Sequence, residues 1–307
     1  MPELPEVETI RMGLLPRLVG HRIEDAHVWG TRIARAQTGG PSALENQIKG
    51  RRIDALARRG KFLWAELDSG SALVFHLGMS GQLRISEGDA VPRATHEHAR
   101  MTLDNGQSLS FIDQRTFGRL EVSDYVDTPD GQVAGWGSER RSIPRSAAHI
   151  GRDPLDDAFD AGQVVSKIRQ SRSPIKNLLL NQELVSGIGN IYADEALFAA
   201  GIHGLRMGKN VRRYEVEEVL DDVAEIMKSA IEVGGTSFDA LYVNADGDPG
   251  YFSRSLAVYG LVGEPCVRCG TPIERVNIQG RSHHYCPTCQ PRSKPGTNLR
   301  FDRLGQA

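Results

Sequence analysis

The sequence has 307 residues, of which 39% are hydrophobic and 25% charged, and its formal net charge is −2. This is the composition of a globular protein, and no apolar stretch is long enough to cross a bilayer. The N-terminus lacks the layout of a signal peptide, so we expect a cytoplasmic monomer whose binding to any nucleic acid would depend on segregated rather than overall charge. The segregated basic runs are "GRRIDALARRGK" and the C-terminal part from Arg268 to Arg303.

The chain opens with "MPELPEVETIRMGLL", which predicts an amphipathic helix from Pro5 onward. Pro5 suits the first turn of a helix because its missing N–H would have no partner there, and Glu6 suits the positive end of the helix dipole. This helix gives no role to Pro2 or Glu3, which precede it.

Short alternating segments follow and predict an antiparallel β-sandwich, with the first helix, over residues 1–122. The turns Asp68-Ser69-Gly70 and Asp104-Asn105-Gly106 are typical of hairpin loops. The expected strands lie in "RIEDAHVWG", "KFLWAELDSG", "SALVFHLG", "GQLRIS", "ARMTLDNG", "QSLSFID" and "GRLEVS".

Residues 123–151 are rich in Gly, Ser, Pro, Asp and Arg and predict an insertion or linker. Helical periodicity then predicts a helical domain over 152–250. Its helices are expected in "IKNLLLNQEL", with Ser173 as N-cap, in "NIYADEALFAAG", and in a long segment with one apolar face. A loop is expected over 235–252 and a flexible tail over 292–307.

All four cysteines lie near the end of the chain, as two C-x-x-C pairs: Cys266, Cys269, Cys286 and Cys289. Two disulfides or free thiols are the alternative, but this spacing favours one tetrahedral zinc ion in a finger over residues 251–291. Four thiolates leave no open coordination position, so the zinc is expected to be structural. Between the pairs, a β-hairpin is expected to turn at Gln279-Gly280 and to present Arg281.

Four motifs together resemble the formamidopyrimidine-DNA glycosylase family: "PELPEVET", "HLGMSGQLR", "SGIGNIYADEALFAAGIH" and the paired cysteines. The resemblance implies an α+β fold with an N-terminal β-sandwich and a helix–two-turn–helix domain carrying a zinc finger. It also implies a bacterial base-excision-repair enzyme that acts at the nucleoid. Such an enzyme excises 8-oxoguanine and formamidopyrimidines from duplex DNA, acts on abasic sites and nicks the strand by β,δ-elimination. No organic cofactor is implied.

The resemblance assigns catalytic roles to Pro2, Glu3, Glu6 and Lys61. Removal of Met1 would expose the secondary amine of Pro2, which can attack C1′ of the damaged nucleotide and form an iminium ion. Glu3 is placed to transfer protons, and Glu6 lies at the helix start in a supporting role. Lys61 matches a lysine that contacts phosphate or lesion, although by itself the residue suits a surface position on a strand.

A base must leave the helical stack before it can be excised, and the resemblance assigns three residues to fill the gap: Met79, Arg115 and Phe117. Met79 lies between glycines on an expected hairpin tip, where a core role is improbable. Arg115 and Phe117 are two residues apart in an expected extended segment and would point the same way. Thr116 stands where relatives often carry a second arginine.

Six further residues are expected to bind DNA, chiefly through phosphates: His76, His96, His98, Lys176, Asn190 and Arg281. His96 and His98 would share one face of an extended segment, for which metal binding is the alternative. Asn190 ends the "SGIGN" loop, whose glycines would let a phosphate approach the backbone. Arg281 is assigned to the phosphates across the scissile site.

Two other functions remain open. The first is an endonuclease VIII-like glycosylase for oxidised pyrimidines, although those relatives typically begin Pro-Glu-Gly and this chain has Leu4. The second is a zinc-containing DNA-binding protein without catalysis, which the presence of Pro2, Glu3 and Lys61 disfavours. The loop over 235–252 departs from relatives that often carry a lysine near Asp239, so lesion preference is not readable there.

Overall fold

The computed structural model describes residues 2–88, 92–235 and 252–292. The chain forms two compact units, each described here by itself. Unit 1 contains residues 1–159, 182–189 and 227–255, and unit 2 contains residues 160–181, 190–226 and 256–307. No helix in the described part of the chain has the length and apolar character of a membrane span.

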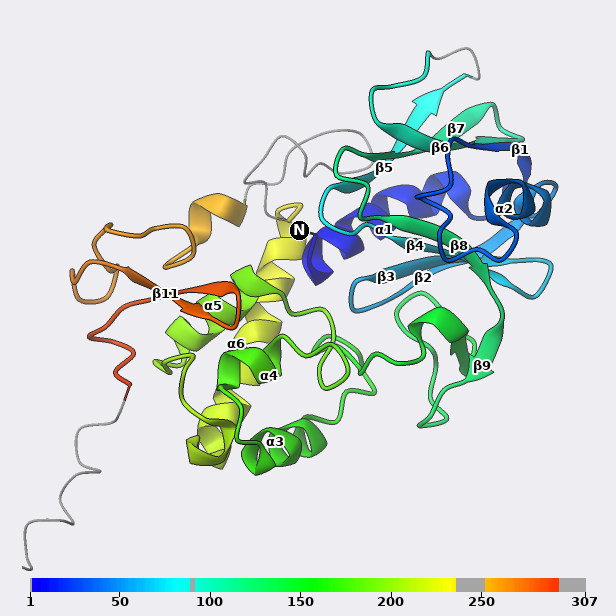
Figure 1. Cartoon of the computed structure of the whole chain (residues 1–307). Helices are drawn as coiled ribbons and strands as arrows, with labels where there is room; N and C mark the ends of the chain where they lie inside the picture. Colours follow the sequence, from blue (N-terminus) through cyan, green and yellow to red (C-terminus); the bar gives the residue numbers. More distant parts are fainter. Residues whose placement is uncertain (1, 89–91, 236–251, 293–307) are drawn as a thin grey trace, which may run out of the picture. The chain divides into compact units, whose positions relative to one another are not determined.

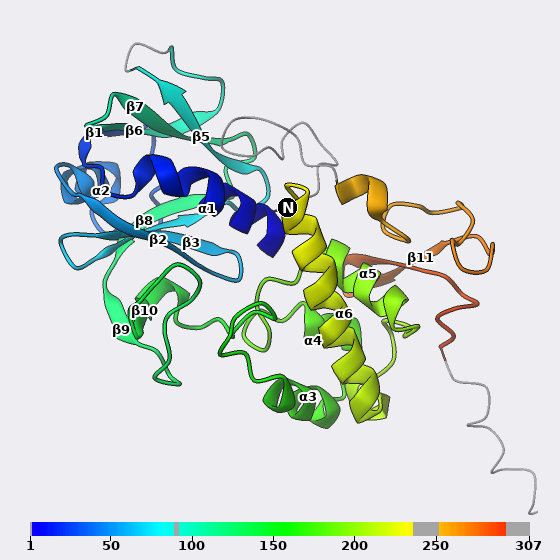
Figure 2. The same ribbon diagram turned by 180° about the vertical axis from the view of Figure 1, so that it is seen from behind.

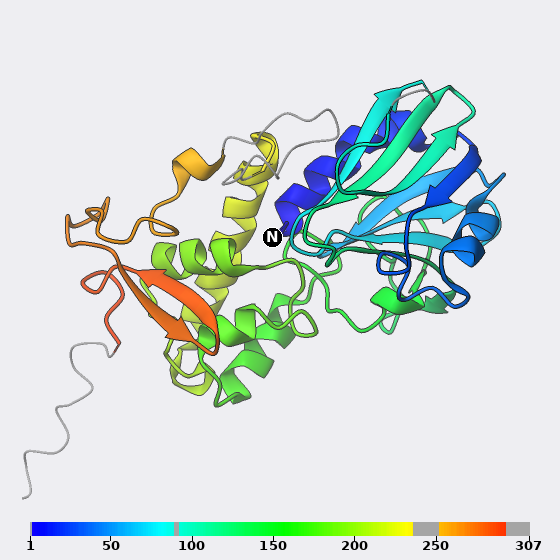
Figure 3. The same cartoon turned by 45° about the horizontal axis from the view of Figure 1, so that its top comes forward.

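Unit 1 is built on two four-stranded antiparallel sheets, as the alternating segments predict (Figures 1 and 3). In order of pairing, the first sheet contains β1 (Ile23–Val28), β6 (Glu97–Leu103), β7 (Gln107–Asp113) and β5 (Gly81–Glu87). The second contains β2 (Ile53–Arg59), β3 (Phe62–Leu67), β4 (Ala72–His76) and β8 (Arg119–Ser123). Both expected hairpins form, because β3 pairs with β4 and β6 with β7.

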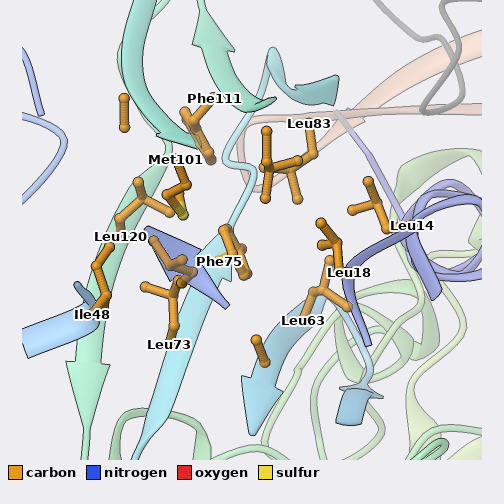
Figure 4. Packing of buried hydrophobic residues seen from close by; sticks show 14 of the residues in the cluster. Leu14, Leu18, Ile48, Leu63, Leu73, Phe75, Leu83, Met101, Phe111 and Leu120 are labelled. Atoms are coloured by element: carbon orange, nitrogen blue, oxygen red, sulfur yellow. The ribbon is translucent and has the colours of Figure 1, made fainter. Parts of the chain in front are cut away.

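The main core lies between these sheets and the helix α1 (Leu4–Leu18), as Figure 4 shows. Leu14 and Leu18 of α1 meet side chains from both sheets, among them Phe75 and Phe111, which are almost fully buried. A second helix, α2 (Gly40–Ile48), lies against β1 and β8. The hydrophobic stripe of α1 therefore anchors the N-terminus of the chain to the sandwich.

Residues 123–151, the predicted insertion or linker, contain regular secondary structure. They form β9 (Tyr125–Asp127), β10 (Ser142–Pro144) and a short 3-10 helix, η1 (Arg145–Ala147). Ile143 and Ala147 of this segment pack with Trp64 and Val74 of the second sheet in a cluster separate from the main core. Figure 2 shows β9 and β10 on the side of that sheet away from α1. This second small core explains why every residue of β3 is buried.

Only part of the basic run "GRRIDALARRGK" is a charged surface: Arg51 and Arg52 are exposed, but Arg58, in β2, is fully buried. Arg58 Nε lies 2.8 Å from Glu8 Oε2 of α1, and Arg58 Nη1 lies 2.9 Å from Asp153 Oδ2. Asp153 Oδ2 also accepts the backbone N–H of Gly60 at 2.9 Å. One buried cation thus joins α1 to the turn that follows β2.

We expect Arg58→Met to destabilise unit 1 by about 3–5 kcal/mol, because it leaves two buried carboxylates without their shared cation. All three tryptophans lie in unit 1, so urea unfolding followed by tryptophan fluorescence measures this loss directly. Lys49→Met is the matched control: Lys49 pairs with Asp25 at 2.7 Å, but both side chains are more than half exposed. The control should change stability by less than about 1 kcal/mol. An Arg58→Met effect as small as the control's would contradict the prediction.

In the residues that the structure describes, unit 2 contains three short helices, the start of a long one and a β-hairpin. These are α3 (Ala161–Gln170), α4 (Ile175–Leu179), α5 (Asn190–Ala199), α6 (Arg213–Glu232) and the pair β11 (Glu274–Ile278) and β12 (Arg281–Tyr285); α6 continues into unit 1. Two further 3-10 turns are η2 (Gly208–Asn210) and η3 (Phe252–Ser255), the latter in unit 1. The expected α5 and α6 are present. The helix α4 is shorter than predicted, and Pro174 rather than Ser173 is its N-cap.

Candidate active site and DNA-contacting residues

The N-terminal residues singled out by the sequence lie at the start of α1 in unit 1. Pro2 is buried, and Glu3 and Glu6 are 2% and 7% exposed. The backbone N–H of Glu3 donates to Glu6 Oε2 at 2.8 Å. Glu6 therefore fixes the backbone next to Pro2, which agrees with a supporting role.

The "SGIGN" loop lies against this N-terminus. The backbone N–H of Leu4 donates to Gly187 O at 3.1 Å. A Cβ on Gly189 would lie 2.1 Å from Glu3 Cδ and 2.3 Å from its Oε1, so the Glu3 carboxylate occupies the space that only glycine leaves free. The sequence assigned this loop to phosphate; in the structure its glycines admit Leu4 and Glu3.

Lys61 joins the same group of residues, from the turn between β2 and β3. Its Nζ donates to Ile188 O at 3.0 Å, so Lys61 and Glu3 contact consecutive residues of one loop. Gln182 Nε2 donates to the same Ile188 carbonyl at 2.9 Å and helps to hold the loop. Lys61 is half-buried, unlike an ordinary surface lysine.

His76 ends β4 near several cations. Burial, followed by the charges of Arg119 and Lys61, lowers the pKa of His76 to about 4. Its Nδ1 accepts the N–H of Gly78 at 3.2 Å, so the proton of the neutral ring is on Nε2. His76 can therefore serve a phosphate as a neutral donor. Arg119 and Lys61 thus supply positive charge beside His76, of the kind expected for DNA binding.

Met79 lies in the turn between β4 and β5. These strands belong to different sheets, so the turn connects the two sheets and is not the hairpin tip that was expected. Met79 is half-buried. A Cβ on Gly78 would lie 2.5 Å from the carbonyl carbon of Phe117, so this turn is packed directly against the segment that carries Arg115 and Phe117.

Arg115 and Phe117 lie in a turn that follows β7 and not in an extended segment. Thr116 between them has a φ of 54°, so alternation along a strand does not apply and that part of the prediction was wrong. The two side chains still lie together, with the Arg115 guanidinium carbon 5.8 Å from the Phe117 ring centroid. Phe117 is 46% exposed, and Arg115 is exposed.

His96 and His98 do not share a strand face. His96 has a φ of 62° and lies in a turn, and the pairing of β6 with β7 is irregular between Glu97 and Ala99. His98 Nε2 lies 2.9 Å from the Asp113 backbone carbonyl, to which it donates. Only His96 is fully exposed of the two, and the extended pair expected from the sequence is absent.

Lys176 is fully buried in unit 2, which is at odds with a direct phosphate contact. Its Nζ lies 2.6 Å from Asp194 Oδ1 and also donates to the Ser282 carbonyl of the hairpin. His283 Nδ1 lies 2.6 Å from the same Asp194 oxygen. Burial would raise the pKa of Asp194, but hydrogen bonds from His283 and His284 and the charge of Lys176 lower it to about 2. In this structure Lys176 holds the hairpin against α5.

Asn190 and Arg281 meet at this hairpin. Asn190, the first residue of α5, donates from Nδ2 to Ser282 Oγ at 3.2 Å. Arg281 precedes Ser282 at the start of β12 and is exposed. The hairpin turn at Gln279-Gly280 forms as predicted. Asn190 thus contacts the residue that follows Arg281 in the hairpin, and the assignment of both to phosphate stays a prediction.

The four cysteines fit a single zinc ion. Their Sγ atoms all lie within 4.8 Å of one another, none is in a disulfide, and Cys269 Sγ lies 3.5 Å from both Cys286 Sγ and Cys289 Sγ. Tetrahedral zinc with bonds of about 2.3 Å requires sulfur atoms about 3.8 Å apart. The donor set is therefore that of a closed, structural zinc site.

We expect Cys286→Ser to abolish specific DNA binding, because Cys286 is fully buried and a broken zinc site unfolds the finger that carries Arg281. Zinc content, measured by a chromogenic chelator after denaturation, should fall from one ion per chain to a small fraction. Tryptophan fluorescence of unit 1 should not change. Unaltered affinity in the zinc-free variant would refute a role for the finger in binding.

Three family models match successive parts of the chain. The family model of the formamidopyrimidine-DNA glycosylase N-terminal domain matches residues 1–120. The H2TH domain of that family matches residues 150–241, and the zinc finger found in FPG and IleRS matches residues 263–292. The matches cover both units and the cysteine site.

Individual relatives extend over almost the whole chain. A formamidopyrimidine-DNA glycosylase of Corynebacterium jeikeium is 48% identical over 290 residues, which are 94% of this chain and 100% of that protein. A Lactococcus lactis FPG variant in complex with Fapy-dG-containing DNA has a TM-score of 0.81 and 33% identity, over 94% of this chain and 100% of that one. A structure of MutM with DNA containing carbocyclic 8-oxo-G has a TM-score of 0.80 and 33% identity, with the same coverage. The chain therefore belongs to the formamidopyrimidine-DNA glycosylase family.

Proposed function

We propose that this chain is a DNA glycosylase and abasic-site lyase that excises 8-oxoguanine and formamidopyrimidines from duplex DNA. The observation that carries the proposal is the contact of Glu3 and Lys61 with the loop 186–189, together with the position of Pro2 next to Glu3 and the bond from the Glu3 backbone to Glu6. Two similar structures contain DNA with Fapy-dG or 8-oxo-G. The cytoplasmic location predicted from the sequence suits a DNA substrate and stays a prediction.

The nucleophile is the imino nitrogen of Pro2, freed by removal of Met1. Its lone pair attacks C1′ of the damaged nucleotide and displaces the base, which leaves with the bonding electrons and takes up a proton. The nitrogen then loses its proton, and its lone pair opens the sugar ring by expelling O4′, which is protonated, so that an iminium ion forms. An α-amino group has a pKa of about 8, so about a tenth of it is uncharged and nucleophilic at pH 7, against less than about a thousandth of a lysine amine. The anchored α1 helix holds this nitrogen in one place, which lowers the entropic cost of the attack.

The resulting iminium ion withdraws electrons from C1′ and makes the C2′ proton acidic. Loss of that proton expels the 3′ phosphate, and a second elimination expels the 5′ phosphate. The Glu3 carboxylate adjoins Pro2 in the chain, within reach of protons on the opening sugar and the departing base. Glu6 holds the backbone of Glu3 and so fixes the direction of that carboxylate.

Charge near this group suits the phosphates that flank the lesion. Lys61 provides an ammonium group from the β2–β3 turn, and neutral His76 can donate its Nε2 proton. Arg281 and Asn190 of unit 2 offer a second set of donors. Because phosphate contacts release counterions, binding should weaken steeply with salt despite the net charge of −2.

Met79, Arg115 and Phe117 are proposed to fill the gap left by the extruded nucleotide. The exposed Phe117 ring can stack on a neighbouring base, and the adjacent Arg115 guanidinium can donate hydrogen bonds to the unpaired partner base. The turn that carries Met79 is in direct contact with the turn that carries Arg115 and Phe117, so the three side chains are supported by one structure.

The test is reductive trapping with borohydride over a panel of duplexes that carry 8-oxoguanine, a formamidopyrimidine, thymine glycol or no damage. We expect covalent adducts with the two purine lesions, since the amine forms its iminium ion only where a base has been released. Adducts with thymine glycol alone would establish the endonuclease VIII-like alternative. Binding to damaged duplex without any adduct would establish the non-catalytic alternative, and the intact mass would then be expected to include Met1.

A further inference from the structure

The two turns that carry Met79, Arg115 and Phe117 share one buried acceptor, the carboxylate of Asp113. Asp113 ends β7 and is fully buried. Its Oδ1 accepts the hydroxyl proton of Ser80 at 2.5 Å and the backbone N–H of Arg115 at 3.2 Å. Ser80 directly follows Met79, so one carboxylate oxygen links both turns.

The second oxygen of Asp113 holds the far end of the Arg115–Phe117 turn. Oδ2 accepts the backbone N–H of Gly118 at 2.7 Å. A Cβ at position 118 would lie 3.0 Å from this oxygen and 2.6 Å from the Phe111 ring, so the turn is closed tightly over the carboxylate. Both ends of the turn are thereby attached to a single rigid group.

Arg35 completes the arrangement by binding the carbonyl groups that Asp113 cannot bind. Its Nη2 donates to Phe117 O at 2.7 Å, and its Nη1 donates to Gly118 O at 2.5 Å and to Arg32 O at 2.9 Å. The backbone N–H groups of the turn therefore bind the Asp113 carboxylate, and its backbone carbonyl groups bind the Arg35 guanidinium. Neither Asp113 nor Arg35 belongs to the residues assigned to DNA or catalysis above.

These contacts stabilise a turn whose backbone conformation is unfavourable by itself. Thr116 has a φ of 54°, a conformation that costs a residue other than glycine about 1–2 kcal/mol. The turn also keeps the apolar Phe117 ring 46% exposed. A loop held in such a conformation before binding loses less entropy when it inserts into a DNA stack.

We propose that Asp113 and Arg35 are positioning residues that hold Met79, Arg115 and Phe117 in the geometry needed to enter the base stack. The inference rests on the proposed function, since it concerns the step in which a duplex is opened. Asp113 and Arg35 touch no substrate in this scheme and act only through the two turns. Loss of either residue should therefore slow excision from duplex DNA and leave the reaction with single-stranded DNA, where no base stack has to be entered, unchanged.

The experiment compares Arg35→Gln with the unaltered protein on two substrates. One is a duplex with 8-oxoguanine, and the other is a single strand with an abasic site, trapped by borohydride. We expect single-turnover excision from the duplex to fall about 10- to 100-fold, the size of effect for lost hydrogen bonds to a charged group. Trapping on the single strand should remain within about twofold.

Arg32→Gln is the matched control. It removes the same charge from the same exposed segment but leaves the hydrogen bonds between Arg35 and the turn in place. Asp113→Asn is the second variant: one oxygen becomes an NH₂ group that faces an N–H or O–H donor. A 2-aminopurine next to the lesion reports unstacking, and its fluorescence rise should be slower in both variants than in the control. Tryptophan fluorescence verifies that unit 1 remains folded.

Equal losses on duplex and single strand would overturn the inference, because they would indicate general damage to the active site. So would a duplex rate in Arg35→Gln no lower than in Arg32→Gln. These outcomes are distinct from failure of the proposed function, in which the unaltered protein itself would form no adduct on either DNA.

Discussion

An N-terminal extension that keeps Pro2 in an amide bond is expected to abolish the covalent adduct with damaged DNA. The amide nitrogen has no available lone pair, so it cannot attack C1′, although every side chain of the site is retained. Excision should fall by more than about 10³-fold, the order of effect for loss of a catalytic nucleophile. The measurement is borohydride trapping and single-turnover excision on a duplex with 8-oxoguanine.

The matched control carries the identical extension at the C-terminus, which leaves the imino nitrogen free once Met1 is removed. Intact mass must show Met1 absent from the control and the extension present on the blocked chain. Trapping by the blocked chain at the control's rate would exclude Pro2. Lys61 would then be the next nucleophile to replace, since its amine lies at the same loop.

The local pattern predicts those parts of the fold that depend on neighbours in the chain. Alternation identifies the strands of the sandwich, and the Asp68–Gly70 and Asp104–Gly106 turns mark its hairpins. The strand β2 and the helices α2 and α3 escaped prediction. In β2 the obstacle is Arg58, which looks like surface charge because its two acidic partners, Glu8 and Asp153, are 50 and 95 residues away in sequence.

The candidate site divides in the same way. Pro2, Glu3 and the cysteines are recognisable because their chemistry is unusual at those positions. The burial of Lys176 and its ion pair with a distant aspartate could not be predicted from the sequence, and its assignment to phosphate stays a prediction. His96 and His98 were misjudged because one left-handed residue ends the alternation that the spacing assumes.

Positioning residues leave the weakest trace in sequence. Asp113 and Arg35 act on backbone atoms of turns, so no periodicity or motif spacing marks them. The loop predicted over 235–252 and the tail over 292–307 fall almost entirely outside the described residues. Lesion preference was expected to depend on that loop, and the trapping experiment on the panel of duplexes is the measurement that determines it.

Gly189→Ala is expected to lower excision by about 100-fold or more, although it adds a single methyl group. That group would lie 2.1 Å from Glu3 Cδ, so the carboxylate has to move away from its place beside Pro2. A displacement of about 1 Å at a catalytic group costs about 10²-fold in rate. The backbone at position 189 is not left-handed, so the effect comes from the contact rather than from strain.

Gly162→Ala is the control for the substitution itself, since its new Cβ would lie 3.4 Å from Asp160 Oδ1 and 3.9 Å from Arg213 Nη2, both without a clash. A double-mutant cycle then isolates the contact with Glu3. In a Glu3→Ala background the methyl group has room, so Gly189→Ala should cost little further activity in single-turnover cleavage of an abasic site. If Gly189→Ala lowers the rate by the same factor in both backgrounds, the glycine acts on something other than Glu3. Non-additive losses would instead identify the space at Gly189 as the feature that aims the carboxylate at the sugar.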